Sequence, residues 1–316
     1  MEHRKFKRRL AELITELTPA QGRKLIDAVR ERSAGDETQK LIDDRFQADL
    51  ACPHCQGRRI HRHGLARGLR RYKCLGCTRT FNALTGTPLA RLRKRERWLK
   101  FAKALGASET VRAAAVRAGI DKSTSFRWRH RFLKARKGLR DRRLTGIVEV
   151  DECFILQSRK GERRLPRKAR KRGGKAEKPG LSGEQTPILI ARDRYGHHLD
   201  AVLPNRSEDA VSAVLKDVVS KTDVLLCMDG DPALIAFAKK EAIEYELILA
   251  SHGEHVHEKV LHIQTVNSYI SRFKKWLDRF NGVATKYLSN YLNWRKMLEK
   301  SATPLTPEHC LVAAMG

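Results

Sequence analysis

Two aspartates stand where apolar strands are expected, and their positions suggest chemistry. Asp151 lies in the middle of the apolar segment GIVEVDECFI, and Asp229 directly follows the apolar run VLLCM. An acid inside a buried strand is costly unless it is paired or binds a cation. Carboxylates that converge in an α/β sheet can hold Mg²⁺ together with phosphate oxygens, and two such ions support phosphoryl transfer. The alternative is that both acids form salt bridges or cap turns.

Two glutamates flank Asp151 and are further candidate contributors to such a site. On a strand, Glu149 shares the face of Asp151, whereas Glu152 points to the other face. Asp231 adds another acid beside Asp229 in the segment DGDPAL.

A helix is expected in the segment HIQTVNSYISRFKKW at 262–276. Asn267 and Lys274 are seven residues apart, so on a helix they share one face at a separation of about 10 Å. Val266, Ile270 and Phe273 form an apolar stripe beside that polar face. The helix could present a neutral oxygen ligand to a metal and a cation to a DNA phosphate. A plain core helix explains the apolar stripe but not the polar row.

Four of the seven cysteines form two CxxC pairs, CPHC and CLGC, that are separated by eighteen residues. Four thiolates around a tetrahedral ion can hold together a segment too small to have its own core. We therefore expect structural Zn²⁺ bound by Cys52, Cys55, Cys74 and Cys77 rather than four unrelated thiols. Between the pairs, the basic residues Arg58, Arg70 and Arg71 are expected to contact phosphate.

Three helices are expected in residues 95–136, with a break at Gly119 before Asp121, a helix-capping residue. This pattern fits a helix-turn-helix, although a basic helical linker is the alternative. The last helix is expected to turn Phe126, and Trp128 as a second candidate, inward and to offer polar and basic side chains to DNA. The candidates are Lys122, Ser123, Ser125, Arg127 and Arg129.

The overall charge of the chain points to an anionic partner. The 316 residues carry 65 Lys and Arg against 36 Asp and Glu, a formal net charge of +29. Such an excess favours nucleic acid as the partner. Without a membrane-spanning run or a signal peptide, we expect a cytoplasmic, nucleoid-associated protein that does not bind membranes. The strand and helix order after residue 146 predicts an α/β domain with a mixed sheet and helices on both faces.

Together, these motifs resemble the ISXO-type insertion-sequence transposases of bacteria. The resemblance runs from about residue 48 to 300 and rests on GIVEVDECFI, LLCMDGD, the VNS segment and NGVATKYL in combination. It implies an RNase H-like catalytic domain with a mixed five-stranded sheet. Asp151 and Asp229 match the family's two aspartates, and Asn267 with Lys274 matches the branch that has Asn in place of a third acid. The expected cofactors are Mg²⁺ or Mn²⁺, two ions per site.

The expected organisation follows from the motifs and the resemblance. It comprises a helical segment at 1–47, a zinc ribbon at 48–88, a helix-turn-helix region at 89–140, the catalytic domain at 141–300 with a basic insert at 158–178, and a C-terminal tail at 301–316. The family also implies binding to terminal inverted repeats, 3′-end cleavage, strand transfer into target DNA, and assembly as a dimer or higher oligomer on DNA.

Three alternatives remain open at this point. The substitution at Asn267 is compatible with a former transposase that now acts as a DNA-binding regulator, and the acids are compatible with a nuclease that lacks strand transfer. A second zinc site is the alternative reading of the histidines at 252–262, with Glu254 or Glu258 as a further ligand, and Glu258 is also an alternative third acid. The spacing of these histidines fits no familiar ligand pattern.

Overall fold

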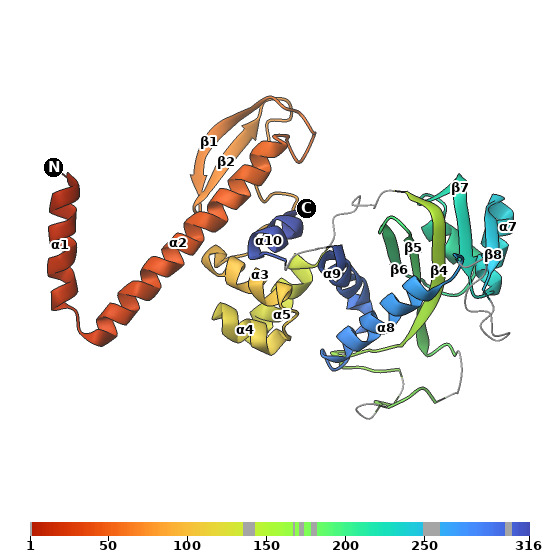
Figure 1. Cartoon of the computed structure of the whole chain (residues 1–316). Helices are drawn as coiled ribbons and strands as arrows, with labels where there is room; N and C mark the ends of the chain where they lie inside the picture. The colour runs from red at the N-terminus through yellow and green to blue at the C-terminus, as the bar shows by residue number, and fades with distance from the viewer. Residues whose placement is uncertain are drawn as a thin grey trace. The chain divides into compact units, whose positions relative to one another are not determined.

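The chain forms two compact units, which we describe separately. The computed structural model describes residues 2–134, 143–166, 168–170, 174–177, 182–248, 260–300 and 305–316. One unit comprises Met1–Phe132 with Thr303–Gly316, and the other comprises Leu133–Ala302. Figure 1 shows the course of the chain through both units.

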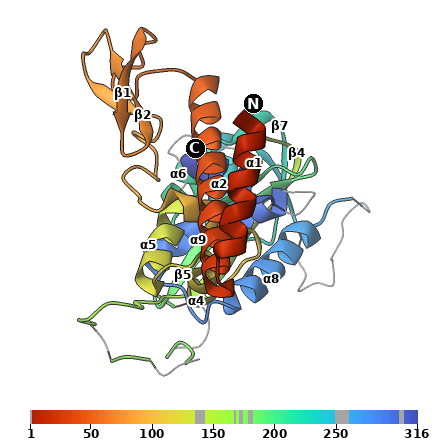
Figure 2. The ribbon, with the colours of Figure 1, turned by 90° about the vertical axis from the view of Figure 1, so that its left-hand side faces the viewer.

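The first unit begins with two helices, α1 (Glu2–Glu16) and α2 (Pro19–Ala48). Thr18 caps α2 in a capping box with Gln21, and Pro19 takes the first helical position, as the sequence indicates. Helix α2 runs unbroken for 30 residues, within the segment at 1–47 that is expected to be helical (Figures 1 and 2). Its last turns are buried at Thr38, Ile42 and Phe46, so tertiary packing extends the helix.

A small three-stranded antiparallel sheet follows α2. Its strands are β1 (Ile60–Ala66), β2 (Leu69–Cys74) and β3 (Thr80–Asn82), in the order β1-β2-β3. Arg67 and Gly68 make the β1–β2 turn with positive φ angles of 52° and 71°, which match the right-handed twist of a tight hairpin. Phe46 of α2 packs on Tyr72 of β2, with ring centroids 4.8 Å apart. The sheet thus has only a minimal aromatic core.

Four helices complete the first unit. They are α3 (Trp98–Gly106), α4 (Val111–Ala118), α5 (Lys122–Phe132) and α10 (Pro307–Met315). Aromatic rings of α3 and α5 form the core, where Trp98 and Phe101 meet Trp128 and Phe132 edge to face. Helix α10 forms in the segment expected as a tail and packs on α3, because Leu311 and Met315 are fully buried.

The second unit is built on a five-stranded mixed sheet, as the sequence predicts. The strands are β4 (Leu144–Leu156), β5 (Gln185–Asp193), β6 (His198–Val202), β7 (Val219–Met228) and β8 (Glu244–Leu247), in the order β6-β5-β4-β7-β8. The central strand β4 is antiparallel to β5 and parallel to β7. β5 and β6 form an antiparallel hairpin.

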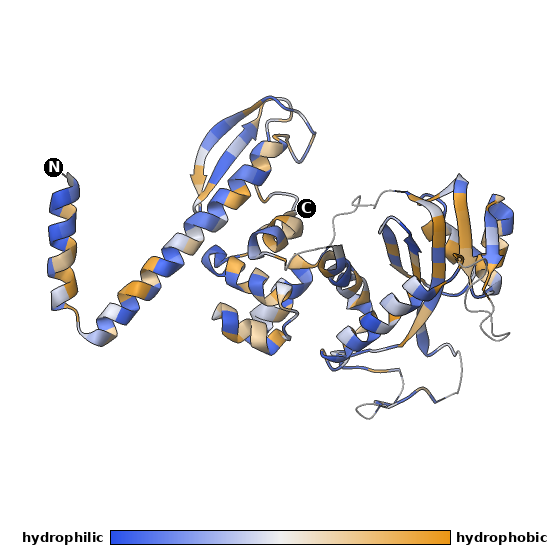
Figure 3. Cartoon of the chain, viewed as in Figure 1, coloured by the Kyte–Doolittle hydropathy of each residue, from blue (hydrophilic) through white to orange (hydrophobic). Residues whose placement is uncertain are grey.

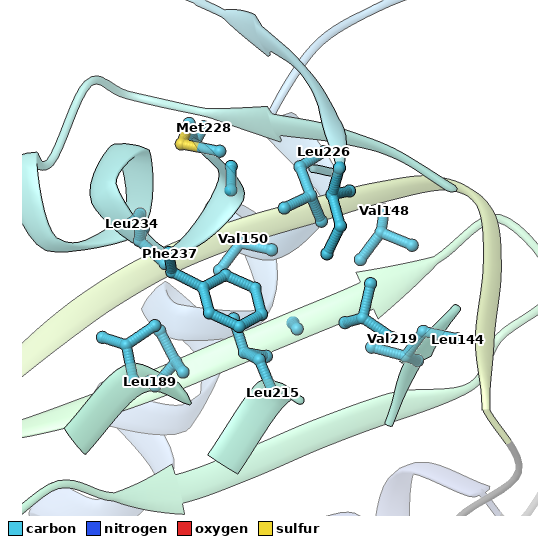
Figure 4. Packing of buried hydrophobic residues seen from close by; sticks show 14 of the residues in the cluster. Leu144, Val148, Val150, Leu189, Leu215, Val219, Leu226, Met228, Leu234 and Phe237 are labelled. Atoms are coloured by element: carbon cyan, nitrogen blue, oxygen red, sulfur yellow. The ribbon is translucent and has the colours of Figure 1, made fainter. Parts of the chain in front are cut away.

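Helices lie on both faces of this sheet. They are α6 (Glu208–Leu215), α7 (Pro232–Glu241), α8 (Gln264–Asp278) and α9 (Leu288–Lys300). One face carries the main apolar core with α6 and α7, in which Val148 and Val150 of β4 pack near Phe237 (Figure 4). Apolar residues of β4 and β7 that supply this core are orange in Figure 3. The opposite face of β4 carries Glu149 and Asp151 and contacts α8.

Within the described part of the chain, none of the helices combines the length and the hydropathy that a membrane span requires.

Candidate functional site

Asp151 lies in β4 on the face that contacts α8, and its surroundings disfavour its charge. Burial first, and then the nearby Asp229 carboxylate, raise the pKa of Asp151 to about 6, while Lys274 of α8 acts in the opposite direction. The backbone N–H of Glu152 donates to Asp151 Oδ1 at 2.7 Å. A bound cation would stabilise the charged form of this carboxylate, as it does for the carboxylate of a metal ligand.

Asp229 reaches the same place from the neighbouring strand. β4 and β7 are parallel and align Glu149 with Cys227, so two residues further along both strands Asp151 and Asp229 lie side by side. Asp229 is exposed at the end of β7, where Gly230 turns the chain toward α7 with a φ of 94°. The sheet therefore brings together two carboxylates that are far apart in the sequence. This donor set of hard oxygen ligands fits Mg²⁺.

The other two acids near this place have different partners. Asp231 caps α7, because its Oδ1 accepts from the N–H groups of Ala233 and Leu234 at 2.9 and 3.3 Å. Arg206 forms an ion pair with Asp231 at 2.6 Å and approaches Glu152 at 3.5 Å. Burial and then Asp231 raise the pKa of Glu152. Arg206 had no motif to mark it in the sequence, and it compensates the charge of both acids.

Helix α8 presents the expected polar face. Val266, Ile270 and Phe273 are buried, together with Tyr269, Trp276 and Leu277. Asn267, Ser271 and Lys274 are exposed. Lys274 lies close enough to Asp151 to lower its pKa, so the structure brings Lys274 and the two aspartates together. Asn267 lies about two turns earlier on the same helix, and its role as a ligand stays a prediction.

A buried polar network attaches α8 to the sheet at a second place that sequence reasoning missed. The Tyr269 hydroxyl donates to Asp200 of β6, and Arg192 of β5 stacks on the Tyr269 ring at 3.9 Å. Burial raises the pKa of Asp200 to about 6. Glu299 of α9 joins this network at Arg192, at 3.8 Å, and also pairs with Arg272 of α8 at 2.7 Å. No local sequence signal marks these pairs, since their members come from four separate elements.

The basic insert and the histidine cluster are only partly described. At the start of the insert, Ser158 and Thr285 exchange two hydrogen bonds of 2.9 Å. Lys160 Nζ donates to the carbonyls of Asn281 and Gly282, so the NGVATKYL segment anchors the end of β4. Residues 252–259, with three of the four histidines and Glu258, lie outside the described residues. The fourth, His262, contacts Glu149 at 3.3 Å.

The four cysteines of the small sheet form a site that suits zinc. Sulfur atoms of Cys52, Cys55, Cys74 and Cys77 all lie within 4.8 Å of one another. The Sγ atoms of Cys52 and Cys77 are 3.6 Å apart, as are those of Cys55 and Cys74. The Cys77 N–H, followed by the Gly76 N–H, lowers the pKa of Cys74 to about 7, which favours the thiolate that binds metal. The structure confirms the predicted cluster of four cysteines and the zinc-ribbon fold around it.

The helices α4 and α5 correct part of the predicted DNA-binding set. Ser125 and Arg129 are buried, and their side chains donate to the backbone carbonyls of Val111 and Glu109. They hold α5 to α4, so we remove them from the set of DNA contacts. Phe126 is 41% exposed, contrary to the expectation that it faces inward, whereas Trp128, the second candidate for the inward face, is buried. Lys122, Ser123 and Arg127 are exposed.

An open cavity lies at the turn between α4 and α5. It has a volume of about 620 Å³, and Lys94, Arg112 and Lys122 are among its lining residues. Gly119 makes the turn in the left-handed conformation with a φ of 61°. Lys94 and Arg112 were not singled out from the sequence, because a basic residue in so basic a chain carries little signal. In the zinc ribbon, Arg58 is exposed and pairs with Asp49 at 3.6 Å, while Arg70 and Arg71 are half-buried.

The sheet order, with Asp151 on the central strand and Asp229 directly after the parallel strand beside it, is that of an RNase H-like domain. Residues 143–295 match the model of the ISXO2-like transposase domain. The chain is 28% identical over 257 residues to the "Uncharacterized protein in transposable element ISH50" of Halobacterium salinarum, across 80% of this chain and 86% of that protein. The resemblance to ISXO-type transposases is confirmed.

A solved structure was also matched. The crystal structure of a pre-cleavage Mos1 transpososome aligns with 68% of this chain and 78% of its own chain at 14% identity. The TM-score of this match is 0.21.

Proposed function

We propose that this protein is a DNA transposase that binds the terminal inverted repeats of an insertion sequence, cleaves at the 3′ ends and joins them to target DNA. The observation that carries the proposal is the meeting of Asp151 and Asp229 on adjacent strands, with Lys274 of α8 near them. The net charge of +29 supports a nucleic-acid substrate.

The proposed roles follow from the chemistry of the side chains. Asp151 and Asp229 would hold two Mg²⁺ or Mn²⁺ ions, and Asn267 would complete the ligand set with an amide oxygen. Such a pair of ions, when bound, activates the attacking oxygen and stabilises the leaving 3′ oxygen. Lys274 steadies the scissile DNA end by its charge on a phosphate, and the buried face of α8 keeps Asn267 and Lys274 at a fixed spacing.

DNA recognition falls to the first unit in this proposal. The zinc ribbon contacts phosphates through Arg58, Arg70 and Arg71. The α4–α5 pair acts as a helix-turn-helix, with Lys122, Ser123 and Arg127 toward DNA. Assembly as a dimer or higher oligomer on two DNA ends, and a place in the cytoplasm at the nucleoid, complete the proposal.

One assay separates this function from its two rivals. The purified protein is incubated with labelled terminal-repeat DNA, Mg²⁺ or Mn²⁺, and a target plasmid. Joined product supports transposition, and cleavage without joining supports a nuclease. Intact bound DNA supports the regulator that the neutral Asn267 leaves open.

The neutral Asn267 leads to a prediction about metal affinity. The site has two firm anionic ligands, so without DNA we expect the second Mg²⁺ to bind weakly, because substrate phosphate supplies the missing negative charge. Isothermal titration of the DNA-free protein should give at most one tight Mg²⁺ site, with a second appearing once terminal-repeat DNA is added. Two tight sites in the free protein would contradict this.

For the α5 helix we predict that Arg127→Ala weakens binding to terminal-repeat DNA. Loss of one phosphate or base contact should raise Kd by about 5- to 100-fold, and a phosphate contact should also reduce the salt slope by about one. Fluorescence anisotropy at several salt concentrations measures both. Lys24→Ala, an exposed cation of α2, removes the same charge and is expected to change Kd less than twofold. Equal effects of the two variants on Kd would mean that Arg127 acts only through its positive charge and makes no specific contact with DNA.

A further inference from the structure

A buried carboxylate that metal binding does not explain lies beside the candidate site. Glu149 is only 2% exposed and stands two residues before Asp151 on the same face of β4. A buried charge is costly unless it is paired and hydrogen-bonded. Its Oε1 lies 2.8 Å from Nη1 of Arg194 and 3.3 Å from Nδ1 of His262. Its Oε2 accepts from the backbone N–H of Val266 at 2.9 Å.

The contact with Val266 supplies an N-terminal cap to α8, which has no capping side chain at its own N-cap residue. The first N–H groups of a helix have no partner within the helix, and a capping side chain ordinarily accepts from the second or third of them. Ile263 at the N-cap of α8 offers no such side chain. Val266 is the third residue of the helix, so Glu149 accepts the hydrogen bond that a local cap would take. Its negative charge also suits the positive end of the helix dipole.

We infer that Glu149 is a positioning residue that caps α8 from the strand carrying Asp151. The inference rests on the proposed function, since it concerns the same site. Asn267 directly follows the capped Val266, and Lys274 lies two turns further on the same helix. The Glu149 carboxylate therefore fixes the start of α8, the helix that carries Asn267 and Lys274, relative to β4, the strand that carries Asp151.

The same contacts separate this role from the other reading of Glu149, as a ligand of the metal. Oε2 is engaged by the Val266 N–H, and Oε1 faces the guanidinium of Arg194 and the ring of His262. Oε1 accepts no hydrogen bond among the described residues, but the Arg194 guanidinium pairs with it at 2.8 Å, so Mg²⁺ would bind Oε1 only by displacing this cation. Arg194 and His262 reach Glu149 from the β5–β6 turn and from the residues just before α8, so the three side chains tie together β4, β5 and the start of α8.

Two variants test the inference. Glu149→Ala removes the cap, whereas Glu149→Gln keeps an oxygen that can accept from Val266. Arg194 is 30% exposed at its side chain and can turn to water when the charge of Glu149 is removed. We expect amide hydrogen exchange in residues 264–268 to speed up about 5- to 30-fold in Glu149→Ala and much less in Glu149→Gln. The rate of DNA cleavage at saturating Mg²⁺ should follow the same order.

The Mg²⁺ concentration for half-maximal cleavage in Glu149→Gln gives the decisive comparison, since this variant keeps the cap, and with it the position of Asn267, and a capping role therefore leaves this concentration unchanged. A rise of tenfold or more in Glu149→Gln would identify Glu149 as a metal ligand and overturn the inference, as would unchanged exchange in Glu149→Ala. Glu244→Ala, which removes an exposed acid of β8, is the matched control and should alter neither readout. If the wild-type protein cleaves no DNA, the proposed function fails, and hydrogen exchange still decides whether Glu149 caps α8.

Discussion

Asp151→Asn is expected to abolish DNA cleavage and strand transfer and, in magnesium-free buffer, to raise the Tm of the protein at neutral pH. The loss of activity follows from the loss of an anionic metal ligand at a site with only two firm ones. The gain in stability follows from the surroundings of Asp151, where burial and Asp229 disfavour the charged form. A residue kept for folding alone would show the opposite effect on Tm.

The pH dependence of this stability gain has a definite sign. The pKa of Asp151 is about 6 in the folded protein against an ordinary value of 3.8, so the folded state holds the proton more tightly. The stability of the wild type therefore falls as pH rises from about 4 to about 6, and the full cost, on the order of 3 kcal/mol, is present above pH 6. Asn bears no charge at any pH, so its advantage should be largest at pH 7 and vanish near pH 4.

Calorimetric melting at pH 4.5 and 7.5, together with the cleavage assay, checks both parts of the prediction. Asp223→Asn changes an exposed aspartate of the same sheet and should leave Tm and activity close to those of the wild type. Residual cleavage by Asp151→Asn would place the active site elsewhere. A lower Tm at pH 7.5 would mean that Asp151 stabilises the fold.

The sequence was sufficient to predict the sheet and its acids because local patterns specify them. Apolar runs that end in acids mark β4 and β7, and the alternation of residues along β4 assigns Glu149 to the face of Asp151. The repeat of apolar residues in α8 likewise separates its buried stripe from Asn267 and Lys274. In each of these cases the period of the side chains matches the period of the element.

The contacts of these residues could not be predicted from the sequence, because they join distant parts of the chain. Glu149 and Val266 are 117 residues apart, and neither carries a motif that names the other. Ser125 and Arg129 were misplaced because polar residues on a helix are usually exposed, whereas here backbone carbonyls accept their hydrogen bonds inside the unit. The helix α10 likewise depends on α3 for a surface on which to bury Leu311.

The second large effect is expected at the zinc ribbon, where Cys74→Ser should release the metal and unfold the segment between Cys52 and Thr80. The apolar core of the small sheet is small and centres on the ring cluster of Phe46, Tyr72 and Phe81. A core of this size cannot offset the chain entropy that is lost on folding without a bound metal ion. Structural zinc contributes on the order of 10 kcal/mol to folding in such segments, so the loss of one ligand removes most of the driving force.

Zinc content by atomic absorption, proteolysis within 52–80 and affinity for terminal-repeat DNA measure this effect together. We expect Cys74→Ser to lose about one zinc per chain, to be cleaved within the ribbon, and to bind DNA at least tenfold more weakly. His61→Ser is the matched control, because His61 is an exposed residue of β1 that four cysteine ligands make unnecessary. Loss of zinc from His61→Ser, or retention of zinc by Cys74→Ser, would show that a mixed set of ligands binds the ion instead of four cysteines. The second unit should melt unchanged in either variant, since its core contains none of these residues.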